Sequence, residues 1–337
     1  MKYYKPTLGR YNYMNSINKL FYVHLDYSRL LFGHNFRDNG HTSSEVPNYW
    51  EHSRNQSSRI FDEVTLLTDV GNLTPTDTDI VMDKIENVKR EDATEIESSS
   101  NLLYDICSEH YPSFYRDAFW FCTLSRLLIV LDYVVGRGIE KFYHMEYDNV
   151  VYGNPNFLDK LPKGIYFSQV GPGIGSAGFI CSNDLQATED FRYELLELLY
   201  QGQNFLASKL KTTHLYEMEM IDYLVSQHEQ FRYLPLFPSD DLYEECGYVF
   251  DGASYGQFLG GTNQGHRAGH YEPHHHFGRR MAEGGLSVDY NDHNPTVIEG
   301  STKAPIFNLH IHNKSMIQEF DPSVEDELRK FKEFMSQ

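Results

Sequence analysis

Hydrophobic and polar residues alternate with two different periods along this chain, and the changes of period predict its strands and helices. Short apolar runs that end in polar residues predict strands at residues 19–24, 63–69, 139–148, 164–170, 234–238 and 304–312. Apolar residues at helical spacing, or polar segments between strands, predict helices at 48–61, 114–135, 184–210 and 216–228, and a last one capped by Ser323. Strands that alternate with helices predict an α/β fold with a largely parallel central sheet.

Four segments interrupt this alternation and are expected to be irregular. They are a polar, acidic excursion at 72–100, a loop at 154–162, a glycine-rich turn from Gly171 to Gly178, and a long loop or lid at 260–294. The lid contains a histidine cluster, which consists of His266, His270, His274, His275 and His276. A second metal site is one interpretation of this cluster. Regular ligand spacing and accompanying acids are sparse, so a solvent-facing lid is preferred.

Composition and charge exclude several classes of protein. The chain has 337 residues, of which 40% are hydrophobic and 23% charged, which suits one large globular domain or two coupled ones. Its 29 basic and 48 acidic residues give a net charge of 29 − 48 = −19. Because such a surface repels phosphate backbones, nucleic acid or an anionic membrane is not expected as the main partner.

The sequence also predicts a soluble, cytoplasmic protein. The first residues contain no apolar segment typical of a signal peptide. The longest apolar run, 127–135, is interrupted by Asp132 and is shorter than the ~20 residues of a membrane span. The cysteines are scattered without a CxxC pair, which favours reduced thiols: Cys107, Cys122, Cys181 and Cys246. Aromatic residues make up 15%, which fits an aromatic core as well as a groove that stacks on bases or sugars.

The triplet Glu146-Tyr147-Asp148 follows an apolar run and is the sharpest chemical signal. Side chains at i and i+2 of a strand share a face, so both carboxylates are expected to point the same way. Two like charges held together are costly unless a cation neutralises them or one is protonated. Strand ends of open α/β sheets bind ligands, so the triplet favours a Mg²⁺ or Mn²⁺ site. Two solvated acids at a strand exit are the alternative.

A second signal lies at the end of the last predicted strand. His310 and His312 share a face by the same period of two, and Lys314 follows. Neutral imidazoles suit a borderline ion such as Mn²⁺ and would complete a carboxylate site, while the lysine could meet a phosphate charge. A pair of hydrogen-bonded histidines at a sheet edge is the alternative.

The order of these motifs resembles that of GT-A-fold, metal-dependent glycosyltransferases, which use nucleotide-sugar donors. The similar stretches are 125–152, 173–179 (Gly-Ile-Gly-Ser-Ala-Gly-Phe), 217–220, 250–257 and 308–314, within about 19–316. Glu146 departs from the family's usual Asp-x-Asp, whereas Asp148 matches its metal-binding position. The resemblance implies one GT-A-like, Rossmann-related domain, 1–337. Its parts would be a nucleotide-binding half (about 19–150), an acceptor and catalytic half (about 151–316) and a C-terminal helix (317–337).

The resemblance also implies roles for individual residues. Asp148 and one histidine, His312 as first choice and His310 as second, would hold Mn²⁺ or Mg²⁺, with Glu146 acting through water or on the donor's ribose. Candidates for donor binding are His24, Asp26, Asp69, Arg126, Glu146, Ser176, Gln257 and Lys314. If the reaction inverts the anomeric centre, Asp251 is the first choice for the general base and Glu217 the second. If it retains configuration, Gln257 or a backbone group would steady the sugar.

The expected function is therefore sugar transfer from a nucleotide donor, UDP-linked, to a carbohydrate hydroxyl. A sugar nucleotidyltransferase is one alternative, but residues 27–40 supply only Arg29 and Arg37 with isolated glycines, not its usual phosphate loop. A non-catalytic carbohydrate- or metal-binding protein is another. The glycines at 173, 175 and 178 match the dinucleotide fingerprint formally, but they lie mid-chain rather than after the first strand.

Overall fold

A mixed sheet forms the centre of the molecule. The computed structural model describes residues 17–24, 47, 49–68, 88–92, 119–210, 216–262, 267–270, 276–291 and 294–321. Within these residues the sheet has seven strands in the order β3-β2-β1-β4-β7-β6-β8. Their bounds are β1 Lys19–His24, β2 Glu63–Thr68, β3 Val88–Asp92, β4 Phe142–Met145, β6 Ile165–Gly171, β7 Ile174–Ser182 and β8 Phe231–Tyr233. β7 runs antiparallel to β4 and β6, and the other neighbours pair in parallel, so the predicted α/β fold is confirmed.

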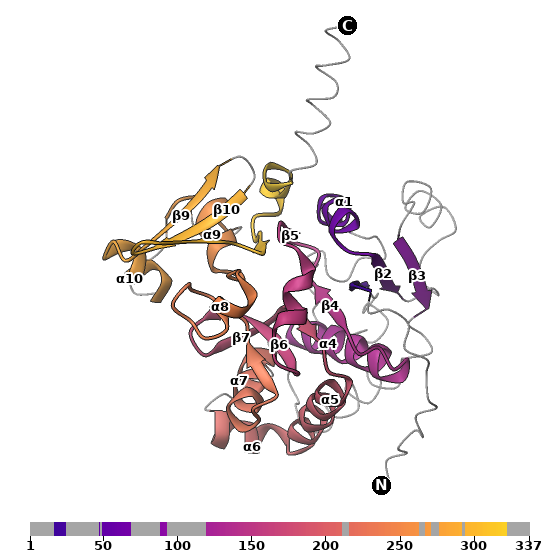
Figure 1. Cartoon of the computed structure of the whole chain (residues 1–337). Coiled ribbons are helices and arrows are strands. Elements are labelled where there is room, and N and C mark those ends of the chain that lie inside the picture. Colours follow the sequence, from indigo (N-terminus) through magenta and orange to yellow (C-terminus); the bar gives the residue numbers. More distant parts are fainter. Residues whose placement is uncertain are drawn as a thin grey trace, which may run out of the picture.

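Strand residues alternate between two hydrophobic cores, one on each face of the sheet. On β1, Phe21 and Val23 belong to one core, and Leu20 and Tyr22 to the other. The first core packs against α4 (Phe119–Gly136), α5 (Leu185–Tyr200), α6 (Gly202–Leu210) and α7 (Glu217–Gln227). The second packs against α1 (Trp50–Ile60) and the 3₁₀ helix η3 (Pro155–Lys160) (Figure 1). Burial on both faces explains why β1 is apolar throughout.

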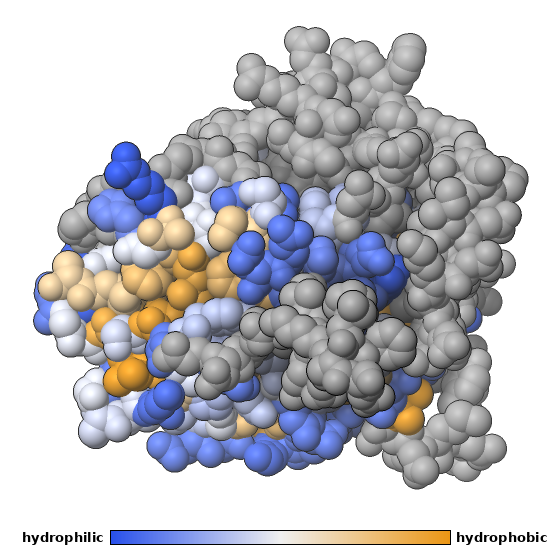
Figure 2. All heavy atoms as spheres, turned by 90° about the horizontal axis from the view of Figure 1, so that it is seen from above, coloured by the Kyte–Doolittle hydropathy of each residue, from blue (hydrophilic) through white to orange (hydrophobic). Residues whose placement is uncertain are grey.

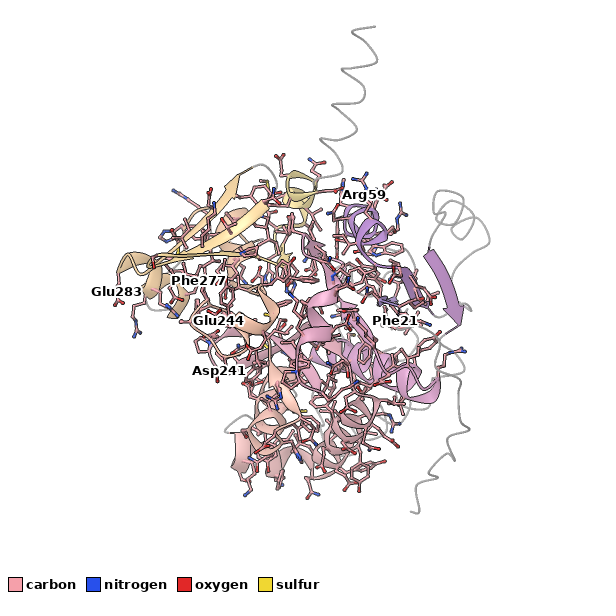
Figure 3. The ribbon with its side chains drawn as sticks, viewed as in Figure 1. Phe21, Arg59, Asp241, Glu244, Phe277 and Glu283 are labelled. Atoms are coloured by element: carbon pink, nitrogen blue, oxygen red, sulfur yellow. The ribbon has the colours of Figure 1, made fainter. Side chains whose placement is uncertain are left out.

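A smaller antiparallel sheet lies beside the central one. Its strands are β9 (Leu286–Asn291), β10 (Asn294–Glu299) and β11 (Thr302–Pro305), with α8 (Tyr243–Cys246), α9 (Ser254–Gly260) and α10 (His276–Ala282) in the same part of the chain. A third core lies here and contains Phe277, whereas Phe21 lies in the central sheet (Figure 3). A two-stranded ribbon of β5 (Asn149–Val151) and β12 (Asn308–His310) connects the two parts, and the 3₁₀ helix η4 (Lys314–Phe320) follows.

The expected glycine-rich turn at 171–178 is confirmed only at residues 172–173, and the rest of that segment is strand. β7 begins at Ile174, because pairing with β6 fixes this segment as a strand, and β4 pairs with its other side from Phe179 on. The expected loop at 260–294 is also wrong in part, since it contains α10 and β9. On β9, Leu286, Val288 and Tyr290 alternate toward the third core, a period of two that the surrounding Gly, His and Asn residues obscure.

Smaller differences concern where elements end. The single helix expected at 184–210 is two helices, because the chain turns at Gly202, whose φ is 78°. The strand expected at 234–238 lies earlier, as β8, and the one expected at 304–312 is divided into β11 and β12. The loop expected at 154–162 contains η3. The helix that Ser323 caps lies outside the described residues, as does most of the 72–100 excursion. The described part of that excursion was wrongly expected to be irregular, since residues 88–92 form β3 against β2.

The described surface is mainly hydrophilic when seen from above. Apolar residues gather toward the left of that view, the side on which β9, β10 and α10 lie in Figure 1 (Figure 2). Among the helices in the described part of the chain, none is long and apolar enough to cross a membrane.

Candidate active site

A tight turn after β4 carries the two acids of the Glu146-Tyr147-Asp148 triplet. The strand ends at Met145, and the Asn149 N–H closes the turn by donating to the Glu146 carbonyl at 3.2 Å. Gly178 on β7 holds the turn from the other side, since its carbonyl accepts from the Glu146 N–H at 3.0 Å and from the Asn149 side chain at 3.1 Å. The two carboxylates therefore converge through a turn, and not through strand alternation as the sequence suggested.

The β5–β12 ribbon brings His310 to these acids. In its register His310 lies opposite Asn149. The His310 Nε2 atom lies 3.1 Å from Asp148 Oδ2 and 3.4 Å from Glu146 Oε2. Glu146, Asp148 and His310 each offer one candidate ligand atom, and these three atoms all lie within 4.8 Å of one another. Asp148 and His310 are both buried, at 6% exposure.

The other ring nitrogen of His310 fixes how the imidazole faces the acids. His310 Nδ1 lies 2.7 Å from the Gly252 carbonyl oxygen, which can only accept, so Nδ1 carries the proton and donates it there. In the neutral ring, Nε2 then presents its lone pair to two carboxylates, an arrangement that a cation between them stabilises. Cis ligands of an octahedral ion with bonds of about 2.1 Å are about 3 Å apart, close to the distances around Nε2. Two carboxylate oxygens and one imidazole nitrogen suit Mn²⁺ or Mg²⁺.

Two cationic side chains contact the acids directly. Arg126 from α4 pairs with Glu146 Oε1, and Lys314 at the start of η4 pairs with Asp148 Oδ2. The Lys314 ammonium also lies 5.5 Å from the centre of the Tyr49 ring. Burial lowers the pKa of Lys314 to about 7, with Glu146 opposing the shift and Arg126 adding to it. Each acid of the triplet is thus matched by one basic side chain in this structure.

Glu217 is a buried acid in the electrostatic field of the same site. It is the first residue of α7, and the Thr123 hydroxyl donates to its Oε2 atom at 3.0 Å. Burial raises the pKa of Glu217 to about 7, and the negative charge of Glu146 acts in the same direction. A carboxyl with this pKa exchanges a proton near neutral pH, as an acid or base catalyst must.

Asp251 is instead surrounded by backbone N–H groups. One carboxylate oxygen accepts from Ala253 at 2.9 Å and Tyr255 at 3.0 Å, and the other from Gly256 at 2.6 Å and His310 at 2.9 Å. The side chain has no exposed surface. This geometry joins the N-terminus of α9 to β12 and favours a structural role over that of a base, the role expected first from the sequence.

His312, the first choice for the metal-binding histidine, lies next to the triad but not in it. Its ring centre is 4.7 Å from that of His310, and its Nδ1 atom lies 3.1 Å from the side-chain amide nitrogen of Gln257 on α9. Burial lowers the pKa of His312 to about 3, so this ring is neutral near pH 7. The triad contains His310, the second choice.

The remaining predicted residues occupy different surroundings. Ser176 on β7 is buried, and its hydroxyl lies 3.4 Å from the Gly252 carbonyl and accepts from the Gly178 N–H. His24 ends β1 and stacks near Tyr147, with ring centres 5.9 Å apart. Asp26 and Asp69 lie outside the described residues, as do His266, His274 and His275 of the histidine cluster. His270 is exposed, and His276 begins α10.

Three contributors to the site were missed in the sequence. The Gly252 carbonyl fixes the His310 ring, Thr123 binds Glu217, and Tyr49 lies beside Lys314. A backbone carbonyl gives no signal in a sequence. Thr123 lies one helical turn before Arg126 on α4, so a search for polar residues on that face would have found it.

No family model and no curated protein matches the sequence. Solved structures with similar folds include mouse xyloside xylosyltransferase 1 in its apo form, at 12% identity, 65% of this chain, 85% of that chain and a TM-score of 0.42. Another is the galactosyltransferase LgtC with donor and acceptor sugar analogues. It has 12% identity, the match covers 65% of this chain and 73% of that chain, and the TM-score is 0.37. A third is the apo form of the glycosyltransferase GlyE of Streptococcus pneumoniae. It has 14% identity, the match covers 66% of this chain and 45% of that chain, and the TM-score is 0.35.

Structural similarity at such low sequence identity does not indicate which reaction this protein catalyses. It concerns the path of the backbone alone.

Proposed function

We propose that this protein transfers a sugar from a nucleoside-diphosphate donor, UDP-linked, to a carbohydrate hydroxyl, with Mn²⁺ or Mg²⁺ bound at Glu146, Asp148 and His310. The observation that carries the proposal is the convergence of two carboxylates on one imidazole nitrogen, Nε2 of His310, whose ring is oriented by the Gly252 carbonyl. A divalent ion there supplies Lewis-acid stabilisation of the departing diphosphate. Because a net charge of −19 disfavours an anionic donor, a bound divalent ion would help by supplying positive charge locally.

The cationic side chains bind and orient the phosphates. Arg126 and Lys314 come from different elements, α4 and η4, and lie on opposite members of the acid pair. Arg126 is buried, and in such surroundings its attraction to a phosphate is stronger than in water. Holding the diphosphate between two cations from different elements also orients the bond to the sugar for attack.

Glu217 is our candidate for the group that removes the proton from the acceptor hydroxyl. With a pKa of about 7, a large fraction of this carboxyl is ionised near neutral pH and still basic enough to take a proton. Asp251 positions His310 through the backbone and is not assigned this proton transfer. Replacing Glu217 with Gln should lower kcat at least 100-fold and leave nucleotide binding within threefold of the wild type.

Thermal-shift titration tests the binding site. Nucleoside diphosphates of each base are added with and without Mn²⁺, and the hydrolysis of matching nucleotide sugars is then measured. We expect one nucleotide to raise the Tm by several degrees only when the metal is present, because ligands that bind only the folded state stabilise it. If no nucleotide produces a metal-dependent shift, the proposed function is wrong.

A pair of matched variants separates the triad from acidic charge in general. Asp148→Asn should abolish the metal-dependent shift. Asp241→Asn removes the same charge from an exposed position on the surface (Figure 3) and should leave the shift unchanged. A shift that survives in Asp148→Asn, or that is lost equally in both variants, would contradict the metal assignment.

A further inference from the structure

The two ion pairs of the active site use the carboxylates differently. Arg126 binds Oε1 of Glu146, and the other oxygen, Oε2, faces His310. Lys314 binds Oδ2 of Asp148, which is the same oxygen that lies 3.1 Å from His310 Nε2. An ion held by the triad can therefore share Glu146 with Arg126 through separate oxygens. On Asp148, however, the ion and the Lys314 ammonium would both contact the same oxygen, Oδ2.

Two cations on one oxygen repel each other strongly. A metal–oxygen bond is about 2.1 Å and a charge-assisted hydrogen bond about 2.8 Å, so ion and ammonium could be at most about 5 Å apart. At that separation, in a buried site, their repulsion opposes simultaneous binding. Asp148 is buried, whereas the Lys314 side chain is 26% exposed, so the lysine is the partner that can move.

We propose that Lys314 is a built-in competitor of the metal, which holds Asp148 through its ammonium and must leave Oδ2 before a divalent ion can bind there. The inference rests on the metal site of the proposed function and adds an antagonism between two groups of that site. Each of the two acids already has one basic partner, Arg126 on Glu146 and Lys314 on Asp148. A divalent ion alone therefore has to displace the lysine.

The consequence is that metal and diphosphate bind cooperatively. A diphosphate offers the displaced ammonium another anionic partner, so the cost of leaving Asp148 falls when both ligands are present. The metal alone should bind weakly, and the metal with a nucleoside diphosphate should bind much more tightly.

Direct titration with Mn²⁺, without nucleotide, tests the competition. Free Mn²⁺ is measured by electron paramagnetic resonance at one fixed pH for all variants. Lys314→Met should bind Mn²⁺ at least tenfold more tightly than the wild type. Lys314→Arg, which keeps the charge, should stay within threefold of the wild type. Unchanged or weaker binding in Lys314→Met overturns the proposal, as does an equal gain in Lys314→Arg.

Arg126→Met is the matched control for charge. It removes one positive charge from the same site, but that charge contacts Oε1 of Glu146, which is not the oxygen that faces His310. We expect Arg126→Met to bind Mn²⁺ less than about threefold more tightly than the wild type. A gain equal to that of Lys314→Met would show a general charge effect and overturn the competition. The double variant Asp148→Asn with Lys314→Met should lose the tight binding, and its persistence would also overturn the proposal.

A labelling measurement on the wild type avoids dependence on a variant that fails to fold. Amine acylation of Lys314 is followed by mass spectrometry with increasing Mn²⁺. Labelling should rise severalfold as the ion saturates the site, while the exposed Lys163 stays constant. Unchanged labelling of Lys314 at saturation overturns the proposal.

The titrations also separate this proposal from the proposed function. If Mn²⁺ binds only when nucleoside diphosphate is present, and Lys314→Met does not bind Mn²⁺ more tightly than the wild type, the competition fails and the proposed function stands. If no protein binds Mn²⁺ under either condition, both fail.

Discussion

Two buried carboxylate centres lie close together in this molecule and are stabilised in opposite ways. Asp251 has backbone N–H groups on both oxygens, whereas Glu146 and Asp148 face side chains, namely Arg126 and Lys314 in addition to His310. Backbone donors are fixed in place by the fold, but side-chain cations can exchange partners. The difference separates a carboxylate that holds the structure together from carboxylates that can bind a ligand.

Removing the Asp251 carboxylate should give the largest loss of stability. Asp251→Ala leaves four buried N–H groups without their acceptor, so we expect the free energy of unfolding to fall by about 3–5 kcal/mol. Chemical denaturation measures this change. Asp148→Asn should cost less than half as much, because its partner Lys314 is partly exposed and the repulsion with Glu146 is relieved. Equal losses would remove the distinction between the two centres.

The pH dependence of stability tests the state of Glu217. Its pKa is raised from 4.5 to about 7 in the folded protein, so between these values the folded state binds more protons than the unfolded state. The free energy of unfolding therefore falls as pH rises through this window, by about 3 kcal/mol for this group, and is constant above it. Glu217→Gln should lack that decrease. A parallel pH profile in the two proteins, from denaturation at pH 5 to 8, would contradict the shift.

Gly256 joins the two centres, because a side chain there would collide with β12. A Cβ atom built at this position lies 2.0 Å from the His310 carbonyl oxygen and 3.0 Å from Asp251. Gly256→Ala should therefore lower stability by about 1–3 kcal/mol and also weaken metal binding, since it displaces His310. Calorimetry and the Mn²⁺ titration measure the two effects. Loss of stability with unchanged metal binding would show that the centres are independent.

The smallest effect is expected for an ion pair on the surface. Lys163 pairs with Glu140 at 2.6 Å, and both side chains are more than half exposed. Lys163→Met should change the free energy of unfolding by less than about 1 kcal/mol, because water and salt screen the pair. A larger change would mean that burial is not what makes the Arg126–Glu146 and Lys314–Asp148 pairs of the candidate site different from surface pairs.

The sequence predicts the sheet better than it predicts the site. The apolar run of β1 and its polar end at His24 specify that strand to the residue, because burial on both faces leaves a continuous signal. The acidic triplet and the histidine pair were found, because each follows an apolar strand. Which histidine joins the acids was not predictable. That choice depends on the Gly252 carbonyl and on the register of β12 with β5, both of which are tertiary contacts.

The β5–β12 ribbon has a consequence for the order of folding. It pairs Asn149 with His310, and 310 − 149 = 161 residues separate them along the chain. Contacts so distant in sequence form late, because a long loop has to close first. The central strands β1, β2 and β4 can assemble during synthesis well before residue 310 leaves the ribosome. The nascent chain therefore carries its two acids without their histidine until most of the protein has been made.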